Sequence, residues 1–183
     1  MKKIIALPLI CFALSGCMKD YTKMSSDDIL LAATTRSSEF DSSEFTFLPS
    51  LHASLNRGFL GSLDQIEFAL GVSKGKNNEV SAQGLMVKIR YFDTEWRYYN
   101  SADFSGGVPA ELKIQNSNVS NCSTYKTLAT RCNYSEMVSI KLDKEFIKRN
   151  QNGFSVRLNS QEGKQNIVTI PENYMNAFAN LVK

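Results

Sequence analysis

Two carboxylates in the middle of the chain come nearest to an acid–base pair. Asp93 and Glu95 stand two positions apart, and Glu136 follows further along the sequence. A glycoside hydrolase needs two carboxyl groups about 5–10 Å apart across a cleft, one of which protonates the leaving group. Residues two apart on a strand share one face, which is commonly solvated in antiparallel sheets. We therefore expect Asp93 and Glu95 to be surface charges, with catalysis by these acids as the alternative.

Glu136 has the pattern of a buried carboxylate. It lies two and four positions before the apolar residues Val138 and Ile140, so on a strand all three side chains would point to the same face. If that face is turned to the core, the charge is buried, and an unpaired buried charge is costly. We predict a structural ion pair with Arg97 or Arg131, and the less favoured alternative is a ligand site.

Residue types for nucleophilic or metal chemistry are sparse. His52 is the single histidine, and a Ser-His-Asp triad needs a histidine held against a shielded nucleophile. The surroundings of His52, from Pro49 to Ser54, indicate a loop or the edge of the core. A zinc site needs Cys and His ligands at characteristic spacings, and the cysteines do not have them. We predict no catalytic residue, no metal and no cofactor.

Aromatic residues around a predicted turn at Asp93 are the strongest candidates for binding. Tyr91, Trp96 and Tyr99 lie close to Arg97 in the sequence, and these residue types are enriched at the energetic centres of protein interfaces. If they are exposed, the four residues would suit a protein or glycan partner. Alternatively, some fill the core and the others form cross-strand pairs. The sequence leaves both interpretations open.

The amino terminus has the pattern of an export signal. Two lysines precede the apolar run Ile4–Leu14, whose eleven residues are too few to cross a hydrocarbon core of about 30 Å. The next residues, Leu14-Ser15-Gly16-Cys17, resemble a bacterial lipobox, so the chain resembles a bacterial lipoprotein precursor. The resemblance implies a signal peptide over 1–16, lipid transfer to the sulfur of Cys17 and acylation (for example by palmitate) of its new amine.

The residue after the lipobox cysteine bears on localisation. Met18 stands where an Asp would signal retention in the inner membrane of enteric bacteria. By resemblance to that rule, the periplasmic leaflet of the outer membrane is expected, and the inner membrane is less favoured. The signal segment holds two of the 21 basic residues and none of the 18 acidic ones, so the mature charge is close to +1. Such a balance does not favour nucleic acid as a partner.

The remaining cysteines fit an oxidising compartment. If Cys11 leaves with the signal peptide and Cys17 carries lipid, Cys122 and Cys132 are left, ten positions apart. In the periplasm such a pair is typical of a disulfide that closes a short loop. We predict this bridge, with a stabilisation of about 2–3 kcal/mol.

Hydrophobic periodicity predicts a mainly β fold. Apolar residues recur at every second position in several segments, with turn residues between them. These segments lie near 66–72, 85–91, 94–99, 112–114, 138–142, 154–158 and 167–170. About seven short strands favour an antiparallel β-sandwich or open barrel. Two helices are predicted as well: one capped by Asp143, and a carboxy-terminal one that begins at Pro171 and packs on the sheet.

The segment before these strands is polar. Residues 17–43 are rich in Ser, Thr and Asp and are predicted to be the lipidated end and a flexible tether, with residues 44–183 as the β-sandwich domain. One short stretch interrupts the tether. Ser25 and Asp28 resemble a capping box before Ile29, and the short helix could dock on the domain or stay marginal.

A second resemblance covers about 65–183. The motifs are Glu95-Trp96-Arg97-x-Tyr99-x-Ser101-Ala102, Gly106-Gly107, the Cys122 and Cys132 pair followed by Tyr134 and Glu136, and Ile170-Pro171-x-x-Tyr174-x-x-x-Phe178. They are similar to a pattern in small exported or lipid-anchored proteobacterial proteins. The resemblance implies a fold and a compartment, and it transfers no site.

These features together predict a non-enzymatic envelope protein. We expect a lipid-anchored periplasmic domain that binds a protein partner and acts by tethering, because anchoring raises the effective concentration near one membrane. Two alternatives stay open. One is an envelope glycan hydrolase that uses acids among Asp93, Glu95 and Glu136. The other is an immunity or inhibitor lipoprotein whose loop at 73–83 or 116–132 blocks a toxin or hydrolase.

Overall fold

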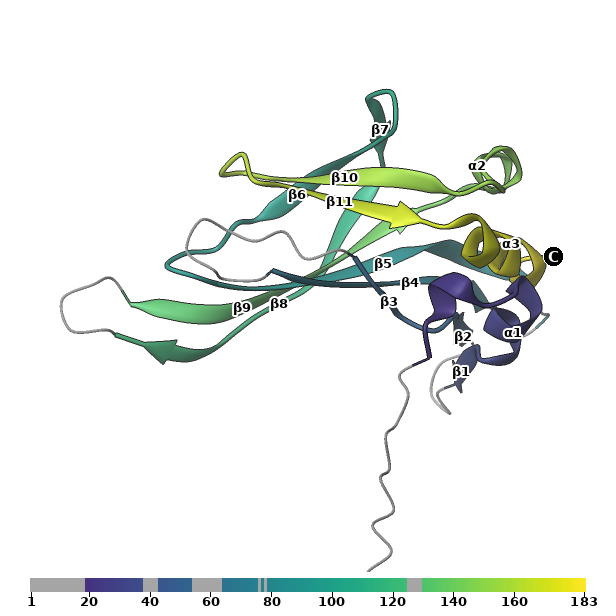
Figure 1. The fold of residues 1–183 in the computed structure, drawn as a ribbon, viewed down its shortest axis with the longest axis horizontal. Helices are drawn as coiled ribbons and strands as arrows, with labels where there is room; N and C mark the ends of the chain where they lie inside the picture. The colour runs from purple at the N-terminus through teal and green to yellow at the C-terminus, as the bar shows by residue number, and fades with distance from the viewer. Residues whose placement is uncertain (1–18, 38–42, 54–63, 76, 78, 125–129) are drawn as a thin grey trace, which may run out of the picture.

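The computed structural model describes residues 19–37, 43–53, 64–75, 77, 79–124 and 130–183. Within these ranges the chain forms two antiparallel sheets that lie face to face, with helices gathered at one end (Figure 1). The predicted mainly β, antiparallel sandwich with a carboxy-terminal helix is therefore confirmed. Residues 1–18, which include the predicted signal peptide and Cys17, lie outside the described residues.

The larger sheet is built around two long strands with alternating apolar residues. These are β4 (Gln65–Lys74) and β5 (Val80–Asp93). The strand order is β1-β2-β4-β5-β9-β8, and β3 also pairs with β4. The other members are β1 (Thr34–Ser37), β2 (Glu44–Phe47), β3 (Leu51–His52), β8 (Leu112–Ser123) and β9 (Arg131–Lys141).

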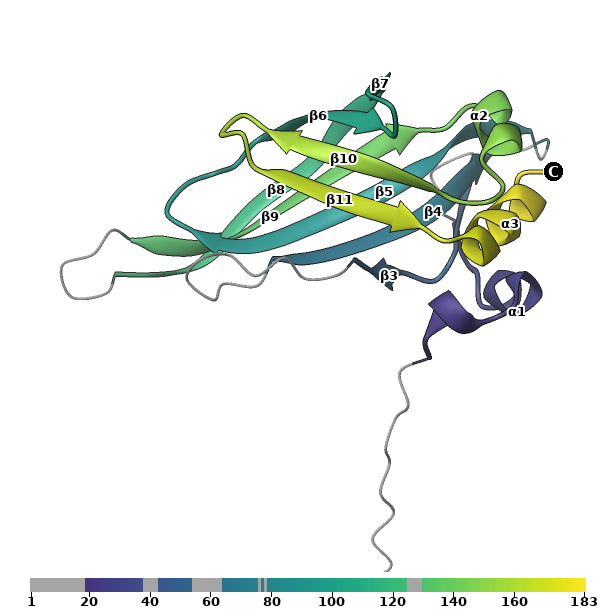
Figure 2. The same ribbon diagram turned by 45° about the horizontal axis from the view of Figure 1, so that its top comes forward.

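The smaller sheet has the order β11-β10-β6-β7 and lies over the larger one (Figure 2). Its strands are β6 (Tyr99–Phe104), β7 (Val108–Ala110), β10 (Phe154–Ser160) and β11 (Gln165–Ile170). The predicted strand over Thr94–Tyr99 is wrong. Residues 94–98 instead form the crossing from β5 to the second sheet, and the strand begins only at Tyr99.

The core forms where the inward positions of both sheets meet. Register aligns Leu70, Leu85 and Ile140 across three strands of the larger sheet, and all three are fully buried. Val156 and Leu158 of β10 are buried opposite them. The period of two in the sequence thus selects the face of each strand that enters the core.

Helix α3 (Glu172–Leu181) closes one end of the sandwich. The ring of Tyr174 meets Phe68 edge to face, at 6.4 Å between ring centres. Its hydroxyl donates to the carbonyl of Pro49 at 2.9 Å and accepts from the N–H of Leu70 at 3.2 Å. The helix is therefore fixed to β4 and to the connection between β2 and β3 by one polar atom as well as by apolar packing.

The segment predicted as a tether is folded over much of its length. It contains η1 (Tyr21–Lys23), α1 (Ser26–Leu31) and β1. Ser25 caps α1 by accepting from the N–H of Asp28 at 3.2 Å, as the capping box predicts. Helix α1 docks on α3, because Ile29 on its apolar side is fully buried in the common core.

A side-chain amide also holds this segment in place. The Nδ2 group of Asn173 on α3 lies 3.3, 3.2 and 2.7 Å from the carbonyl oxygens of Tyr21, Thr22 and Met24. The flexible tether expected over residues 17–43 is thus replaced, from Tyr21 to Ser37, by helix and strand. The physical reason is the apolar content of α1, whose Ile29 is buried where the helix meets α3.

The predicted helix after Asp143 is present as α2 (Lys144–Arg149). The Asp143 side chain accepts from the N–H of Phe146 at 2.6 Å. Gly153 ends this connection with a φ of 91°, and an added Cβ there would collide with the carbonyl oxygen of Ile170. A glycine is therefore required where the chain enters β10.

Candidate functional site

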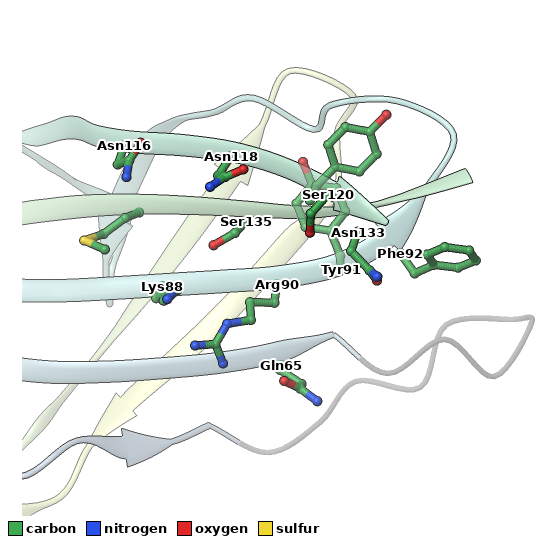
Figure 3. A pocket seen from close by; sticks show the side chains of 12 residues that line it. Gln65, Lys88, Arg90, Tyr91, Phe92, Asn116, Asn118, Ser120, Asn133 and Ser135 are labelled. Carbon is green, nitrogen blue, oxygen red and sulfur yellow. The ribbon is translucent and has the colours of Figure 1, made fainter. Parts of the chain in front are cut away.

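The outer face of the larger sheet contains a polar hollow of about 380 Å³. Figure 3 shows its side chains spread over neighbouring strands, with Lys88 and Arg90 from β5 at its centre. We define the polar face by the residues that carry its chemistry, which are Lys88, Arg90, Asn116, Asn118, Asn133 and Ser135. On β5 and β9 these side chains point away from the core because the intervening residues are buried, and Asn116 and Asn118 of β8 lie opposite outward-facing residues of β9.

Strand register arranges the polar face in rows. One row runs from Gln65 through Arg90 and Ser135 to Asn118. The next joins Lys88 to Met137 and Asn116, and a third joins Phe92 to Asn133 and Ser120. Directly opposite residues in antiparallel strands point to the same side of the sheet. The hollow is therefore a regular array of amides, hydroxyls and cations, with Met137 and Phe92 as its apolar members.

The polar face has a positive balance. Arg90 pairs with Glu67 at 3.6 Å, and this pair is partly exposed. Among the described residues, Lys88 forms no salt bridge. Surface pairs of this kind contribute little to stability. Both cations are consequently available to a ligand that carries negative charge.

The predicted partner-binding set is mostly buried. Tyr91, Arg97 and Tyr99 are 3%, 5% and 0% exposed, so these three residues cannot form a contact surface. Trp96 is partly buried and packs edge-on against Tyr134, with 4.7 Å between ring centres. Only Trp96 of the four can meet a partner. The exposed aromatic of this segment is its neighbour Tyr98, which stacks obliquely on Trp96.

Glu136 organises the crossing that carries these aromatics. It is buried, as the sequence pattern predicts. Its carboxylate accepts from the Tyr91 hydroxyl at 2.5 Å and from the backbone N–H groups of Tyr98 and Tyr99 at 3.2 and 3.0 Å. The expected ion pair with Arg97 or Arg131 is wrong. A phenol and two peptide N–H groups satisfy the carboxylate instead, which compensates for its burial.

Arg97 makes a second set of buried contacts beside the first. Its guanidinium pairs with Asp64 at 2.5 Å and with Asp93 at 3.3 Å. Burial opposes the charge of Arg97, but the hydrogen bonds to Asp64 and Tyr99 raise its pKa above the ordinary value. Arg97 therefore stays charged inside the fold and joins β5, the crossing and the segment before β4.

The three acids considered for a hydrolase lie in different surroundings and have different partners. Asp93 bonds to Arg97 and to Lys164, the latter at 2.8 Å. Burial alone would raise the pKa of Asp93, but the hydrogen bonds from Lys164 and from the N–H of Thr94 outweigh it and lower that pKa. Asp93 and Glu136 are thus engaged in structural bonds.

Glu95 lies at a different place, beside an acid that the sequence did not single out. Together with Trp96, Tyr98 and Glu162 it lines a shallow hollow of about 480 Å³. Burial, followed by the charge of Glu95, raises the pKa of Glu162. The two carboxylates come together because the turn after β10 returns to the crossing, where the N–H of Gln161 donates to the carbonyl of Tyr98 at 3.2 Å.

A match to the nucleophile elbow Gly-x-Ser-x-Gly occurs at Gly71-Val72-Ser73-Lys74-Gly75. In hydrolases this motif forms a tight strand-to-helix turn, whereas here it continues β4. The Ser73 hydroxyl accepts from Ser81 at 3.0 Å. His52 pairs with Glu67, six residues along β4 from Ser73 and so about 20 Å away. The motif therefore does not assemble a triad with His52.

Strand β8 forms an open edge of the larger sheet. Every residue after Leu112 is exposed. Ile114 and Val119 face inward, since they pair with the buried Val138 and Tyr134, yet they are 57% and 45% exposed. The β8–β9 end extends beyond the smaller sheet in Figures 1 and 2. Ile114, near the start of β8, and Val119, further along it, are both left exposed on this edge strand.

The predicted disulfide is present between Cys122 and Cys132. It joins β8 to β9 near the end of this ribbon. The segment 116–123, predicted as part of a loop, is strand, and so is 80–83. In the described ranges no group of three or more His, Cys, Asp or Glu side chains could hold a metal ion. No helix described in the structure has the length and apolar character needed to span a membrane.

No protein-family model matches the chain, and comparison with curated proteins and with solved structures also finds no match. Function is therefore inferred from the geometry of these sites.

Proposed function

We propose that the chain is a lipid-anchored envelope protein, carried by Cys17 at the periplasmic leaflet of the outer membrane, that binds a protein partner without a chemical step. The observation that carries the binding role is the open edge of β8. The lipobox resemblance at residues 14–17 supports the anchor.

The β8 edge contains one stretch that is free of the devices that block strand addition. Natural edge strands are protected by short length, proline, charge or bulges. β8 runs from Leu112 to Ser123, and its sequence contains no proline and one charge, Lys113. Irregularities at Gln115 and after Ser120 leave Asn116–Ser120 as a regular stretch. An extended segment of a partner can pair with this stretch through its backbone.

Exposed apolar side chains indicate what the partner segment contains. On β7, Val108 pairs with Phe104, a partly buried residue that packs against the core. Val108 itself is 57% exposed. With Ile114 and Val119 of β8, it lies on the edges of the two sheets and on their inward faces. A partner strand with apolar residues at alternate positions would cover them, and burial favours this by about 25 cal/mol per Å². The occupant we propose is such an uncharged, alternating segment.

The folded amino terminus makes the anchor short. Residues 18–20 are all that separate Cys17 from η1, and an extended chain spans at most about 3.6 Å per residue. The end of the domain that carries α1 and α3 would therefore stay within about 15 Å of the acylated sulfur. The β8–β9 end lies at the opposite end of the long axis (Figure 1), where a partner from the periplasm can reach it.

Site-specific photocrosslinking in cells tests the binding role. A crosslinker at Val119 should give a discrete adduct, whereas one at Ile167 should give none. Ile167 is the matched control because it is an exposed apolar residue on the outer face of a strand. Ser117 pairs with Glu136, whose backbone bonds toward β5, so the N–H of Ser117 points to the open edge. The variant Ser117→Pro removes this edge N–H and should abolish the Val119 adduct. Equal labelling at both positions, or an adduct that survives Ser117→Pro, would contradict strand addition at β8.

Labelling with a fatty acid tests the anchor independently. The wild-type chain should incorporate the label and fractionate with membranes, and Cys17→Ala should do neither. A mature product whose first residue is not Cys17 would overturn the anchor, but it would leave the edge of β8 to be judged by the crosslinks.

A further inference from the structure

We propose that the polar face of the larger sheet binds an acidic glycan, a sugar chain that carries carboxylate groups. This site is separate from the edge of β8, because a ligand here lies on the sheet and does not pair with its backbone.

The side-chain amides of the polar face match the chemistry of sugar hydroxyls. Each hydroxyl both donates and accepts hydrogen bonds, and so does each Asn or Gln side chain. Asn116, Asn118 and Asn133 belong to the hollow, with Gln65 in the row of Arg90. Four amides on one sheet face offer donors and acceptors together. A partner that carries only acceptors would leave the acceptor oxygens of these amides without hydrogen bonds.

Charge complementarity indicates that the ligand is an anion. Lys88 and Arg90 lie two residues apart on β5 and on the same side of the sheet. Glu67 on β4 pairs with Arg90 at 3.6 Å and stands opposite Lys88, so two cations share one acid and the face keeps a positive excess. A carboxylate on the ligand can take one face of the Arg90 guanidinium and the Lys88 ammonium, and charge-assisted hydrogen bonds are the stronger ones.

A nucleic acid fits this face less well than a glycan. Nucleic acid binding needs several phosphates neutralised at once and aromatic rings on which bases stack. The hollow provides two cations, and Phe92 in its third row is partly buried. The ratio of amides to cations instead fits a chain with many hydroxyls and few charges.

The array is preorganised by the sheet. β4, β5, β9 and β8 are adjacent, and neighbouring strands lie about 4.8 Å apart with about 6.7 Å between alternate residues. Four strands and three rows therefore give a platform about 14 Å on each side. Because the rows are fixed by backbone pairing, little ordering is needed when a ligand binds.

Three probes of equal length separate the contributions of charge and hydroxyl groups. The full chain, purified from membranes in detergent, is titrated with trigalacturonate, maltotriose and triglutamate by calorimetry. Trigalacturonate should bind, and its affinity should fall as salt is added. Arg90→Gln and Lys88→Gln should each weaken it about tenfold. Arg157→Gln should leave it unchanged, since Arg157 is an equally exposed arginine on β10.

Several outcomes would overturn this proposal. They are the absence of trigalacturonate binding, equal binding of maltotriose or triglutamate, and an Arg157→Gln variant as weak as Arg90→Gln. Thermal unfolding of each variant shows whether the fold is kept, and Asn118→Ala provides an uncharged second test that should also weaken binding. The crosslinks at Val119 use the edge of β8, so either proposal can fail without the other.

Discussion

The guanidinium carbon of Arg97 lies 4.2 Å from the centre of the Tyr91 ring. The backbone N–H of the same arginine donates to the Tyr91 hydroxyl at 2.9 Å, and that hydroxyl donates to Glu136. Burial, and then the hydrogen bond to Glu136, raises the pKa of Tyr91. One tyrosine thus links a buried cation to a buried carboxylate that do not touch each other.

This arrangement predicts a large effect for Arg97→Met. Removing one member of a buried charge pair leaves its partners uncompensated and costs about 3–5 kcal/mol, and here Asp64 loses a partner at 2.5 Å. Urea unfolding followed by circular dichroism measures the change. Arg90→Met is the matched control, because its pair with Glu67 is partly exposed and should contribute less than about 1 kcal/mol. Similar losses in the two variants would contradict a structural role for Arg97.

The bond from Lys164 to Asp93 predicts a dependence on pH. The folded state lowers the pKa of Asp93, so its stabilising effect is complete above the unfolded pKa of about 3.9. The effect is lost as the pH falls through the folded value. Lys164→Met should therefore reduce the free energy of unfolding at pH 7 by less than about 1 kcal/mol, because Lys164 is 46% exposed.

The difference between wild type and Lys164→Met should vanish in acid, once Asp93 is protonated in both proteins. Measurements of unfolding at pH 7, at pH 5 and in steps below pH 4 check this, because the difference disappears only below the lowered pKa of Asp93. Lys148→Met on α2 controls for the loss of one positive charge. A difference that stays constant down to the lowest pH would show that Lys164 acts through packing alone.

Local sequence patterns predicted the regular elements well, and the crossing badly. β4, β5, β10 and β11 show a period of two, and Asp143 and Pro171 mark the two later helices. Residues 94–98 share that alternation, yet they do not form a strand. The carboxylate of Glu136 accepts hydrogen bonds from the backbone N–H groups of Tyr98 and Tyr99. Tyr98 also has a φ of 52°, which is outside the strand region. Such a long-range bond leaves no trace in the local pattern.

The candidate sites were accessible to sequence analysis only in part. The sequence shows that Lys88 and Arg90 share one face of a strand, because they alternate with the apolar residues Val87 and Ile89. The contribution of β8 was not visible, since the irregularity at Gln115 changes which residues of that strand face outward. Nor could the sequence show that Glu162 lies beside Glu95, a proximity that depends on a turn folding back onto the crossing.

The disulfide predicts a loss of overall stability together with a larger local change at the bridged end of β8 and β9. Replacing Cys122 and Cys132 by alanine should lower the free energy of unfolding by about 2–3 kcal/mol, because the closed loop is short. Hydrogen exchange should increase most in the outer parts of β8 and β9, which the bridge joins. Adding a reductant to the wild type should reproduce the change. An increase spread evenly over both sheets would contradict the additional local effect at the bridged end.

Two residues of α1 decide whether the amino-terminal segment belongs to the domain or is a tether. Ile29 is fully buried, whereas Leu31, two positions later, is 85% exposed. Ile29→Ala should cost about 2–5 kcal/mol, as other large-to-small changes in a core do. Leu31→Ala should change stability by less than about 0.5 kcal/mol. Both substitutions have similar effects on intrinsic helix preference, so the difference between them reports docking on α3. If the two variants unfolded at the same denaturant concentration, α1 would not be packed in solution, and the short distance between anchor and domain would no longer follow.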